Sequence, residues 1–418
     1  MSNVIGGGIF FVPVIVAQLV PDPRWMLSVW LAGGALAFVG AMAYAELAAV
    51  RPHAGGEYVY LRDAYGPLAA FLTGWTSFIA GFSGAIAASA IALADYVTRF
   101  VPAAAGAKPL IAIVAIAALT LIHVRGLGPG RLVQNLLAAL KVTAIVLILA
   151  LGFTIGNGTA ANLSAAGQAR ALPWLLALVP VMFSYSGWNA AAYVAEEVRN
   201  PGRNVPLALA LGTVAVIVLY LGLNALYLFA LPVTQLGGMG DGRLMDTVAE
   251  RLFGFATGHL LAVFTIVSLA ASISAMVLAG PRVYFAMARD GIFVRAAGRV
   301  HPRFHTPATA IVAQAVWSSI LVMSGTLSQL VNYTGFAVVL FAGIGVSSLF
   351  VLRGRDPAAP RPFSAFGYPW APAIFVLASA LMVANAFWRE PRTTAAGLVL
   401  ILLGIPVYFA FRSGVPRK

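Results

Sequence analysis

Long apolar segments follow one another along the whole chain, with short polar stretches between them. There are twelve, centred near residues 10, 37, 83, 115, 144, 184, 217, 272, 316, 341, 379 and 402. Most extend for about 20 residues, the helix length that crosses the hydrocarbon core of a bilayer. The pattern predicts an all-α membrane protein with about twelve transmembrane helices.

Two of the twelve segments are interrupted near their middle. The first contains "NVIGGGIFFVP", in which Gly6, Gly7 and Gly8 each weaken a helix by about 1 kcal/mol relative to alanine. The sixth contains "MFSYSGWNAAAYVAEEV", where Ser186 and Asn189 interrupt the apolar run at a similar depth. Small residues in a membrane helix also serve close helix packing. Because the interruptions lie five segments apart, we favour a substrate site between two discontinuous helices of an inverted repeat.

Such a site has a definite chemical preference. Unwound backbone inside a membrane needs protein, water or a ligand to complete its hydrogen bonds. Amides at the start of a half-helix favour an anion, and carbonyls at the end of a half-helix favour a cation. An amino acid zwitterion carries both charges a few ångströms apart, so it fits a pair of broken helices.

The composition agrees with a membrane protein and explains the strong positive charge. The chain is 61% hydrophobic and 9% charged, with a mean hydropathy of +0.91. A net charge of +13 could indicate nucleic acid binding, but most of the 26 Lys and Arg fall in alternate loops on one side of the predicted bundle. Cytoplasmic loops show this excess. We therefore expect both termini in the cytoplasm, an inner-membrane location and no nucleic acid partner.

Catalytic and metal-binding patterns are weak in this sequence. The five histidines fall in loops or at segment ends, without ligand spacing inside the membrane, and there is no cysteine. Asp95 has no acidic neighbour in sequence with which to form a carboxylate pair. We expect no metal and no cofactor, and we place a membrane-embedded enzyme behind a transporter.

Several motifs resemble one known family of transporters. They are "VIGGGIF" in the first segment, "YAELAAVRPHAGGEYVYLRDAYG" at 44–66, "FSYSGWNAAAYVAEEVRNPGRNVP" at 183–206, "PRVYFAMARDG" at 281–291 and "RPFSAFGYPWAP" at 361–372. Together they resemble the amino acid-polyamine-organocation superfamily, most of all its L-type amino-acid transporter branch. The resemblance implies a 5+5 inverted repeat with discontinuous helices 1 and 6 plus two extra helices. It places the first repeat in 1–155, the second in 172–352 and the extra helices in 370–412, all within one transporter domain, 1–418.

The resemblance also implies a substrate site on the two breaks, formed by Val4, Ile5, Gly6, Gly7, Gly8, Phe183, Ser186 and Asn189. The amides of Gly7 and Gly8 would hold the substrate carboxylate. The carbonyls of Val4 or Ile5 would hold its ammonium from the first segment. Those of Phe183 and Ser186 would do so from the sixth.

Two side chains of the sixth segment have alternative interpretations. Phe183 resembles the aromatic gate that the family places over its substrate, but it could equally be an ordinary core aromatic. Asn189 resembles a polar residue that lines the pocket, and the alternative is that it caps the second half-helix.

Lys141 is the most informative single charge. It lies inside the fifth apolar segment, "QNLLAALKVTAIVLILALG", where an unpaired ammonium is costly. The resemblance implies that its amine lies near the first break, in place of the ion that sodium-coupled relatives hold there. The alternative is a lysine that snorkels to the cytoplasmic interface.

Substrate class follows from the charges that the apolar segments lack. No Asp or Glu lies in the middle of a segment, so we expect neutral amino acids, with a cationic amino acid or a polyamine as the alternative. We expect ion pairs that help close an inner gate at the inner ends of segments two and six, where charges cluster at Glu46, Arg51, Glu57, Arg62, Asp63, Glu196, Glu197, Arg199 and Arg203. The simpler alternative is that these are solvated loop charges. The substrate and the lipid bilayer are the expected partners, and no partner subunit is evident.

The start of the chain is short for its first helix. Five residues precede Gly6, whereas covering the inner half of a bilayer needs roughly a dozen residues of helix before the glycines. We therefore expect the first repeat to be incomplete, and the native chain to begin upstream of Met1 by about 10 to 30 residues. The alternative is a truncated gene product.

Overall fold

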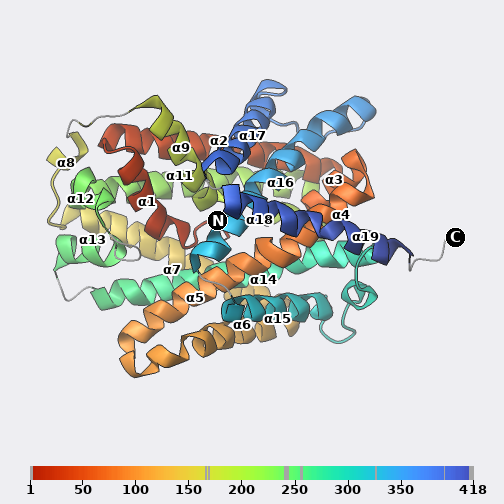
Figure 1. Cartoon of the computed structure of the whole chain (residues 1–418), viewed down its shortest axis with the longest axis horizontal. Coiled ribbons are helices and arrows are strands. Elements are labelled where there is room, and N and C mark those ends of the chain that lie inside the picture. Colours follow the sequence, from red (N-terminus) through yellow and green to blue (C-terminus); the bar gives the residue numbers. More distant parts are fainter. Residues whose placement is uncertain are drawn as a thin grey trace.

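The computed structural model describes residues 3–164, 167, 170–239, 244–254, 258–324, 327–389 and 391–413. All regular structure within these ranges is helical, and Figure 1 shows most of the long helices running side by side along the longest axis of the molecule. The predicted all-α class is confirmed.

The long helices correspond to the predicted apolar segments. Within the described residues, nine spans are long and apolar enough to cross a membrane, and three further apolar helices are shorter. The longer ones are α2 (Pro23–Val50), α4 with α5 (Pro67–Thr76 and Phe82–Phe100), α6 (Lys108–Val124), α7 (Leu127–Thr154), α11 (Pro201–Ala230), α14 (Gly258–Arg289), α16 (Leu327–Arg355), α17 (Trp370–Arg389) and α18 with α19 (Pro391–Leu402 and Gly404–Ser413). The shorter ones are α1 (Gly8–Leu19), α9 (Ala171–Tyr185) and α15 (Ala308–Ser324).

Short helices occupy the two ends of the bundle. Figure 1 shows α3 (Glu57–Tyr65) and α19 at the right-hand end, and α8 (Ala161–Ser164), α12 (Val233–Gly237) and α13 (Leu244–Phe253) at the left-hand end. Three more short elements connect the spans: η2 (Pro102–Ala107), η3 (Ala195–Glu197) and η5 (Arg295–Gly298). We call the end that carries α3 the inner end.

Helix α2 is fixed at its start by its sequence. The side chain of Asp22 accepts hydrogen bonds from the amides of Arg24 and Trp25, both at 3.0 Å, and Pro23 occupies the first helical position. An acidic N-cap followed by proline satisfies the free amides of a helix start and sets its first φ angle. The second oxygen of Asp22 accepts from the amide of Gly167 at 3.0 Å, which ties the connection after α7 to the same point.

Close packing between α2 and the neighbouring spans positions the candidate site. Gly33 contacts Val181 of α9, and a β-carbon at this glycine would collide with that side chain. Gly34 contacts Ile217 of α11, where a β-carbon would lie 2.8 Å from Cγ1. Small residues let membrane helices approach each other closely. The glycines of α2 therefore hold α9 and α11 against one face of the same helix.

Candidate functional site

Both predicted breaks are present, and they lie against each other. Residues 3–7 are not helical and α1 begins at Gly8; α9 ends at Tyr185, and residues 186–189 form turns before the short helix α10 (Ala190–Tyr193). A β-carbon at Gly8 would lie 2.9 Å from Cα of Ser184, so the start of α1 touches the last turn of α9. Two segments about 180 positions apart in sequence therefore form one polar region inside the bundle.

The start of α1 offers backbone amides without a side-chain cap. Gly7 is the N-cap residue, and no side chain caps the helix there. The atoms closest to a β-carbon at Gly7 would be Leu269 Cδ2 and Phe11 Cε1, both at 3.8 Å, which is ordinary van der Waals contact. At Gly6 such a carbon would lie 3.6 Å from Ser272 Oγ. Uncapped amides at a helix start are suited to an anion such as a carboxylate.

The carbonyls of the first break already accept hydrogen bonds from side chains. The Val4 carbonyl accepts from the Tyr220 hydroxyl at 2.8 Å. The Ile5 carbonyl accepts from Lys141 Nζ and from Ser272 Oγ, the latter at 3.0 Å. The predicted ammonium contacts of the first break are therefore occupied by protein donors in this conformation.

Tyr220 of α11 was not among the predicted site residues. Its hydroxyl lies 2.8 Å from the Val4 carbonyl and 3.1 Å from the Ser184 carbonyl, so it contacts both broken segments. It is fully buried, and its ring packs on Tyr185 with centroids 5.0 Å apart. The only sequence feature that indicates this role is a tyrosine hydroxyl in an apolar span, which needs a hydrogen-bond partner.

The second break has a different set of contacts. The Phe183 carbonyl accepts from the Ser186 amide at 3.0 Å, which closes the last turn of α9. Asn189 is the N-cap residue of α10 but makes no capping hydrogen bond; its Nδ2 donates to the Tyr193 hydroxyl at 3.1 Å. The capping alternative for Asn189 is therefore wrong in this conformation. Gly187, with φ +93°, allows the chain to turn between these residues.

Phe183 lies between α1 and α16. Its half-buried ring is 6.2 Å from that of Phe11, measured between centroids. A β-carbon at Gly335 of α16 would lie 3.2 Å from Cδ2 of the same ring. The ring thus covers one side of the broken region at a contact with two other helices, a position open to either predicted role.

Lys141 lies at the first break and not at the membrane interface. Its side chain is fully buried, and Nζ donates to the Ile5 carbonyl and, at 3.0 Å, to Ser272 Oγ of α14. The snorkelling alternative is therefore wrong. The Lys141 amine on α7 thus joins the unwound segment of span one to α14, and it shares the Ile5 carbonyl with Ser272.

Buried carboxylates lie away from the breaks. Among the described residues, three acidic side chains are buried: Asp22 at the outer start of α2, and Glu46 and Glu57 towards the inner end. Each has its own partners elsewhere. No group of three or more potential metal ligands occurs among the described residues either. The broken region thus contains amides, carbonyls, hydroxyls and one ammonium, a set suited to a zwitterion with an uncharged side chain.

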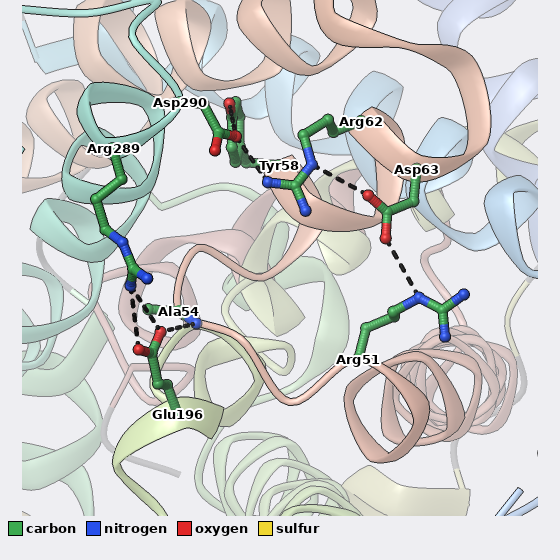
Figure 2. Close-up of polar contacts among 8 residues, drawn as sticks. All are labelled: Arg51, Ala54, Tyr58, Arg62, Asp63, Glu196, Arg289 and Asp290. Atoms are coloured by element: carbon green, nitrogen blue, oxygen red, sulfur yellow. Dashed lines mark hydrogen bonds and ion pairs between the residues drawn. The ribbon is translucent and has the colours of Figure 1, made fainter. Parts of the chain in front are cut away.

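Ion pairs join α2, α3 and α14 at the inner end. Figure 2 shows Asp63 between Arg51, at 3.2 Å, and Arg62, at 3.0 Å. Arg62 also pairs with Asp290 at 2.7 Å, and Asp290 accepts a hydrogen bond from the Tyr58 hydroxyl at 2.6 Å. These side chains are partly exposed, so each pair contributes little by itself, but as a network they connect three elements.

A second group joins span six to α14 and to the α2–α3 connection. Glu196 pairs with Arg289 at 3.1 Å and accepts from the Ala54 amide at 2.9 Å (Figure 2). The Ala54 amide and then Arg289 hold the pKa of Glu196 below its ordinary value. Arg282, almost fully buried, binds both oxygens of Glu197, at 2.9 and 3.3 Å. The ion pairs expected at this end are therefore confirmed for Glu196 and Glu197.

The remaining charges of the predicted cluster behave in three ways. Glu46 is bound by Arg353 through two hydrogen bonds, at 2.8 and 2.6 Å. Glu57 differs from the prediction, because its partner is the Tyr44 hydroxyl at 2.7 Å and not a cation. Arg199 and Arg203 are exposed and take part in none of the ion pairs found among the described residues.

Comparison with known proteins identifies similar chains. The amino acid permease family profile matches residues 1–411. The human cystine/glutamate transporter is 30% identical over 422 residues, covering 98% of this chain and 83% of the relative. The Bacillus subtilis serine/threonine exchanger SteT is 28% identical over 417 residues, covering 99% and 94%. The human large neutral amino acids transporter small subunit 2 is 28% identical over 421 residues, covering 98% and 78%.

Proposed function

The chain belongs to the amino acid permease family, and from this premise we propose that it carries neutral amino acids across the inner membrane without sodium. As a member of this family it is a multi-pass membrane protein that transports amino acids and is not an enzyme. One observation supports the finer proposal most: the two broken helices touch each other, a buried lysine binds the first of them, and the buried acids among the described residues lie elsewhere.

Each end of a zwitterion has a complement in the broken region. The carboxylate is held by the amides at Gly7 and Gly8, which stand at the positive end of the α1 dipole. The ammonium is held by carbonyls at the end of α9, near Phe183 and Ser186, the negative end of that helix. Backbone groups recognise the part that all amino acids share, so the side chain is selected by the surrounding apolar residues.

Lys141 supports independence from sodium. A sodium ion at a broken helix would bind backbone carbonyls such as that of Ile5, and the Lys141 ammonium already donates to this carbonyl. The amine is covalently attached to the chain, so it does not leave the site as a bound ion would. Transport then needs no sodium gradient, and it proceeds by exchange or with protons.

The inner-end ion pairs support alternating access. In this conformation Arg62–Asp290 and Arg289–Glu196 join α3 and η3 to α14, which keeps the inner end closed. We propose that this end faces the cytoplasm, with both termini on that side, because the loops there hold most of the arginines. We further propose that 1–155 and 172–352 are the two repeats that move against each other, with 370–412 as the added helices.

The test is uptake into proteoliposomes that contain purified protein. Labelled alanine, serine and leucine are compared in sodium and in choline buffers, with lysine and putrescine as cationic competitors. We expect equal uptake in both buffers and no competition by the cations. Strict dependence on sodium would contradict the role of Lys141, and strong competition by lysine or putrescine would favour the cationic alternative.

A further inference from the structure

Glu57 is a buried carboxylate whose described partners are tyrosines. It begins α3 and is 7% exposed. Its Oε2 accepts from the Tyr44 hydroxyl of α2 at 2.7 Å, and the Tyr193 hydroxyl of α10 is a second hydrogen-bond partner. Within the described part of the chain, Glu57 forms no ion pair. This arrangement is unusual, because a buried carboxylate is normally paired with a cation or is protonated.

The cations on the elements that surround Glu57 are each bound to another acid, beginning with Arg51 at the end of α2, which pairs with Asp63. On α16, Arg353 is bound by Glu46. On α14, Arg282 is bound by Glu197. On α3 itself, Arg62 pairs with Asp63 and Asp290, and Arg289 of α14 pairs with Glu196 of η3. The titratable groups that interact with Glu57 are thus the hydroxyls of Tyr44, Tyr60 and Tyr193, which are uncharged at neutral pH.

The environment of Glu57 favours its neutral form. Burial raises the pKa of Glu57, against the hydrogen bonds from Tyr44 and Tyr193, which lower it. Tyr44 is itself held in place: a β-carbon at Gly345 of α16 would collide with its hydroxyl. Its ring also meets that of Trp188 edge-on, with centroids 5.0 Å apart. Tyr44 is therefore packed tightly between α16 and Trp188 in this conformation.

The same contacts link Glu57 to the inner half of span six. The Gly55 amide donates to the Tyr193 carbonyl at 3.2 Å. A β-carbon at Gly56, which has φ +52°, would lie 2.6 Å from the Tyr193 ring. The start of α3 and α10 thus close on each other around the Glu57 carboxyl. In the proposed alternating-access cycle, opening of the inner end would separate α10 from α3 and expose the carboxyl to water.

We infer that Glu57 is a proton-binding site of the inner gate, protonated while the gate is closed and ionised when the gate opens. This inference rests on the proposed function, because it assumes alternating access. The proton bound on closing comes from the cytoplasm and returns there on opening, so it is not transported.

The direction of the pH effect follows from linkage. A carboxyl with a higher pKa in the closed state than in water binds its proton more tightly when the gate is closed. Proton binding therefore stabilises the closed gate at low pH, and this stabilisation is lost as the pH rises through the closed-state pKa. Acidification of the cytoplasm should hold the gate shut. Each unit of pKa difference between the two states changes the open-to-closed ratio by about tenfold.

The test measures opening of the gate and does not require transport. The chain has no cysteine, so Ala192→Cys, at a fully buried residue of α10, introduces a single reporter thiol. Its rate of labelling by a maleimide is measured in detergent from a pH of about 4, near the ordinary carboxyl pKa, up to about 8, because burial shifts the pKa of Glu57 upwards. The same cysteine in a Glu57→Gln background corrects for the pH dependence of the thiol itself. The matched control is Glu250→Gln, which removes an exposed carboxyl on α13 at the opposite end.

We expect labelling relative to the Glu57→Gln background to rise several-fold, up to about tenfold, from the lower to the higher pH. Glu250→Gln should leave this rise intact. Tyr193→Phe keeps the carboxyl but removes a hydrogen bond that lowers its pKa, so the rise should move to higher pH. It also tests the inference if Glu57→Gln fails to fold. The inference is overturned if the labelling rate of the chain that keeps Glu57 does not rise with pH. It is also overturned if Tyr193→Phe leaves the pH of that rise unchanged. Failure to bind or carry amino acids would instead contradict the proposed function, because the labelling result stands without it.

Discussion

Neighbouring glycines at the start of α1 should respond to the same substitution in opposite ways. Gly8 packs against Ser184, where a β-carbon would lie 2.9 Å from Cα and 2.9 Å from Oγ. A backbone atom cannot move aside cheaply, so Gly8→Ala should lower stability by about 1 to 3 kcal/mol, the usual cost of overpacking. At Gly7 the closest atoms, Leu269 Cδ2 and Phe11 Cε1, are 3.8 Å away, which is ordinary contact.

Gly7→Ala should therefore preserve the fold. Gly7 has φ −61° and ψ −31°, angles that alanine adopts readily, so stability should be unchanged or higher by about 0.4 to 1 kcal/mol. In the proposed site, the added methyl group would lie beside the amides that hold the substrate carboxylate. We expect affinity for serine or leucine to fall at least tenfold, which corresponds to about 1.4 kcal/mol.

Thermal unfolding of the purified variants in detergent, with and without amino acid, measures both quantities in one assay. The expected pattern is a Gly7→Ala protein that unfolds at the temperature of the unsubstituted chain but gains little from ligand. Gly8→Ala should unfold at a lower temperature. If Gly7→Ala binds amino acids as tightly as the unsubstituted chain, the carboxylate does not lie at the start of α1.

Three further substitutions test other contacts. Tyr220→Phe deprives two buried carbonyls of their donor and should destabilise the protein by about 1 to 3 kcal/mol in thermal unfolding; an unchanged unfolding temperature would contradict the hydrogen bonds. Lys141→Met should abolish uptake in choline buffer, whereas Lys141→Arg should retain part of it, and full uptake by the methionine variant would rule out an essential ammonium. Glu46→Gln leaves Arg353 without its carboxylate and should lower stability by up to about 3 kcal/mol, less than for a fully buried pair because the Arg353 side chain is 20% exposed. Asp95→Asn removes the exposed ion pair with Lys108 and should lower stability by well under 1 kcal/mol.

The architecture was predictable because its evidence is local. Each apolar segment indicates its own span by length and composition, and the breaks at Gly6–Gly8 and near Ser186 interrupt segments that are otherwise continuous. The position of Lys141 came from family resemblance, since an isolated sequence allowed two directions for its side chain. The contact with the Ile5 carbonyl decides between those directions.

Contacts between distant spans were not predictable. Nothing near Tyr220 in sequence indicates that its hydroxyl reaches the first and sixth spans, because that depends on how α11 is rotated in the bundle. The π-helical turn Ser77–Gly81 between α4 and α5 likewise depends on side chains that are distant in sequence. The Ser77 and Ile79 carbonyls accept hydrogen bonds from Tyr284 and Trp317, which are more than 200 residues away in sequence.

Glu57 shows how charge clusters mislead. Arg51 and Arg62 lie within six residues of it, which made an ion pair the natural expectation. Helix α3 instead directs Glu57 inward, towards Tyr44, while Arg62 extends to Asp290 on the surface. Closeness in sequence indicates which charges lie in the same region. The helix face on which each residue lies decides which of them are buried and which are exposed to water.

The hydroxyl of Tyr220 has a single hydrogen, yet it lies within bonding distance of two carbonyls, those of Val4 and Ser184. Only one of the two carbonyls accepts that hydrogen at any moment, so the other carbonyl is left without the tyrosine as its donor. An ammonium group brings three N–H bonds and could serve the neglected carbonyl without displacing the tyrosine. A bound substrate would then fix the orientation of the Tyr220 O–H bond. In this way α11 would respond to occupation of the site, although it contributes neither an amide nor a charge to substrate binding.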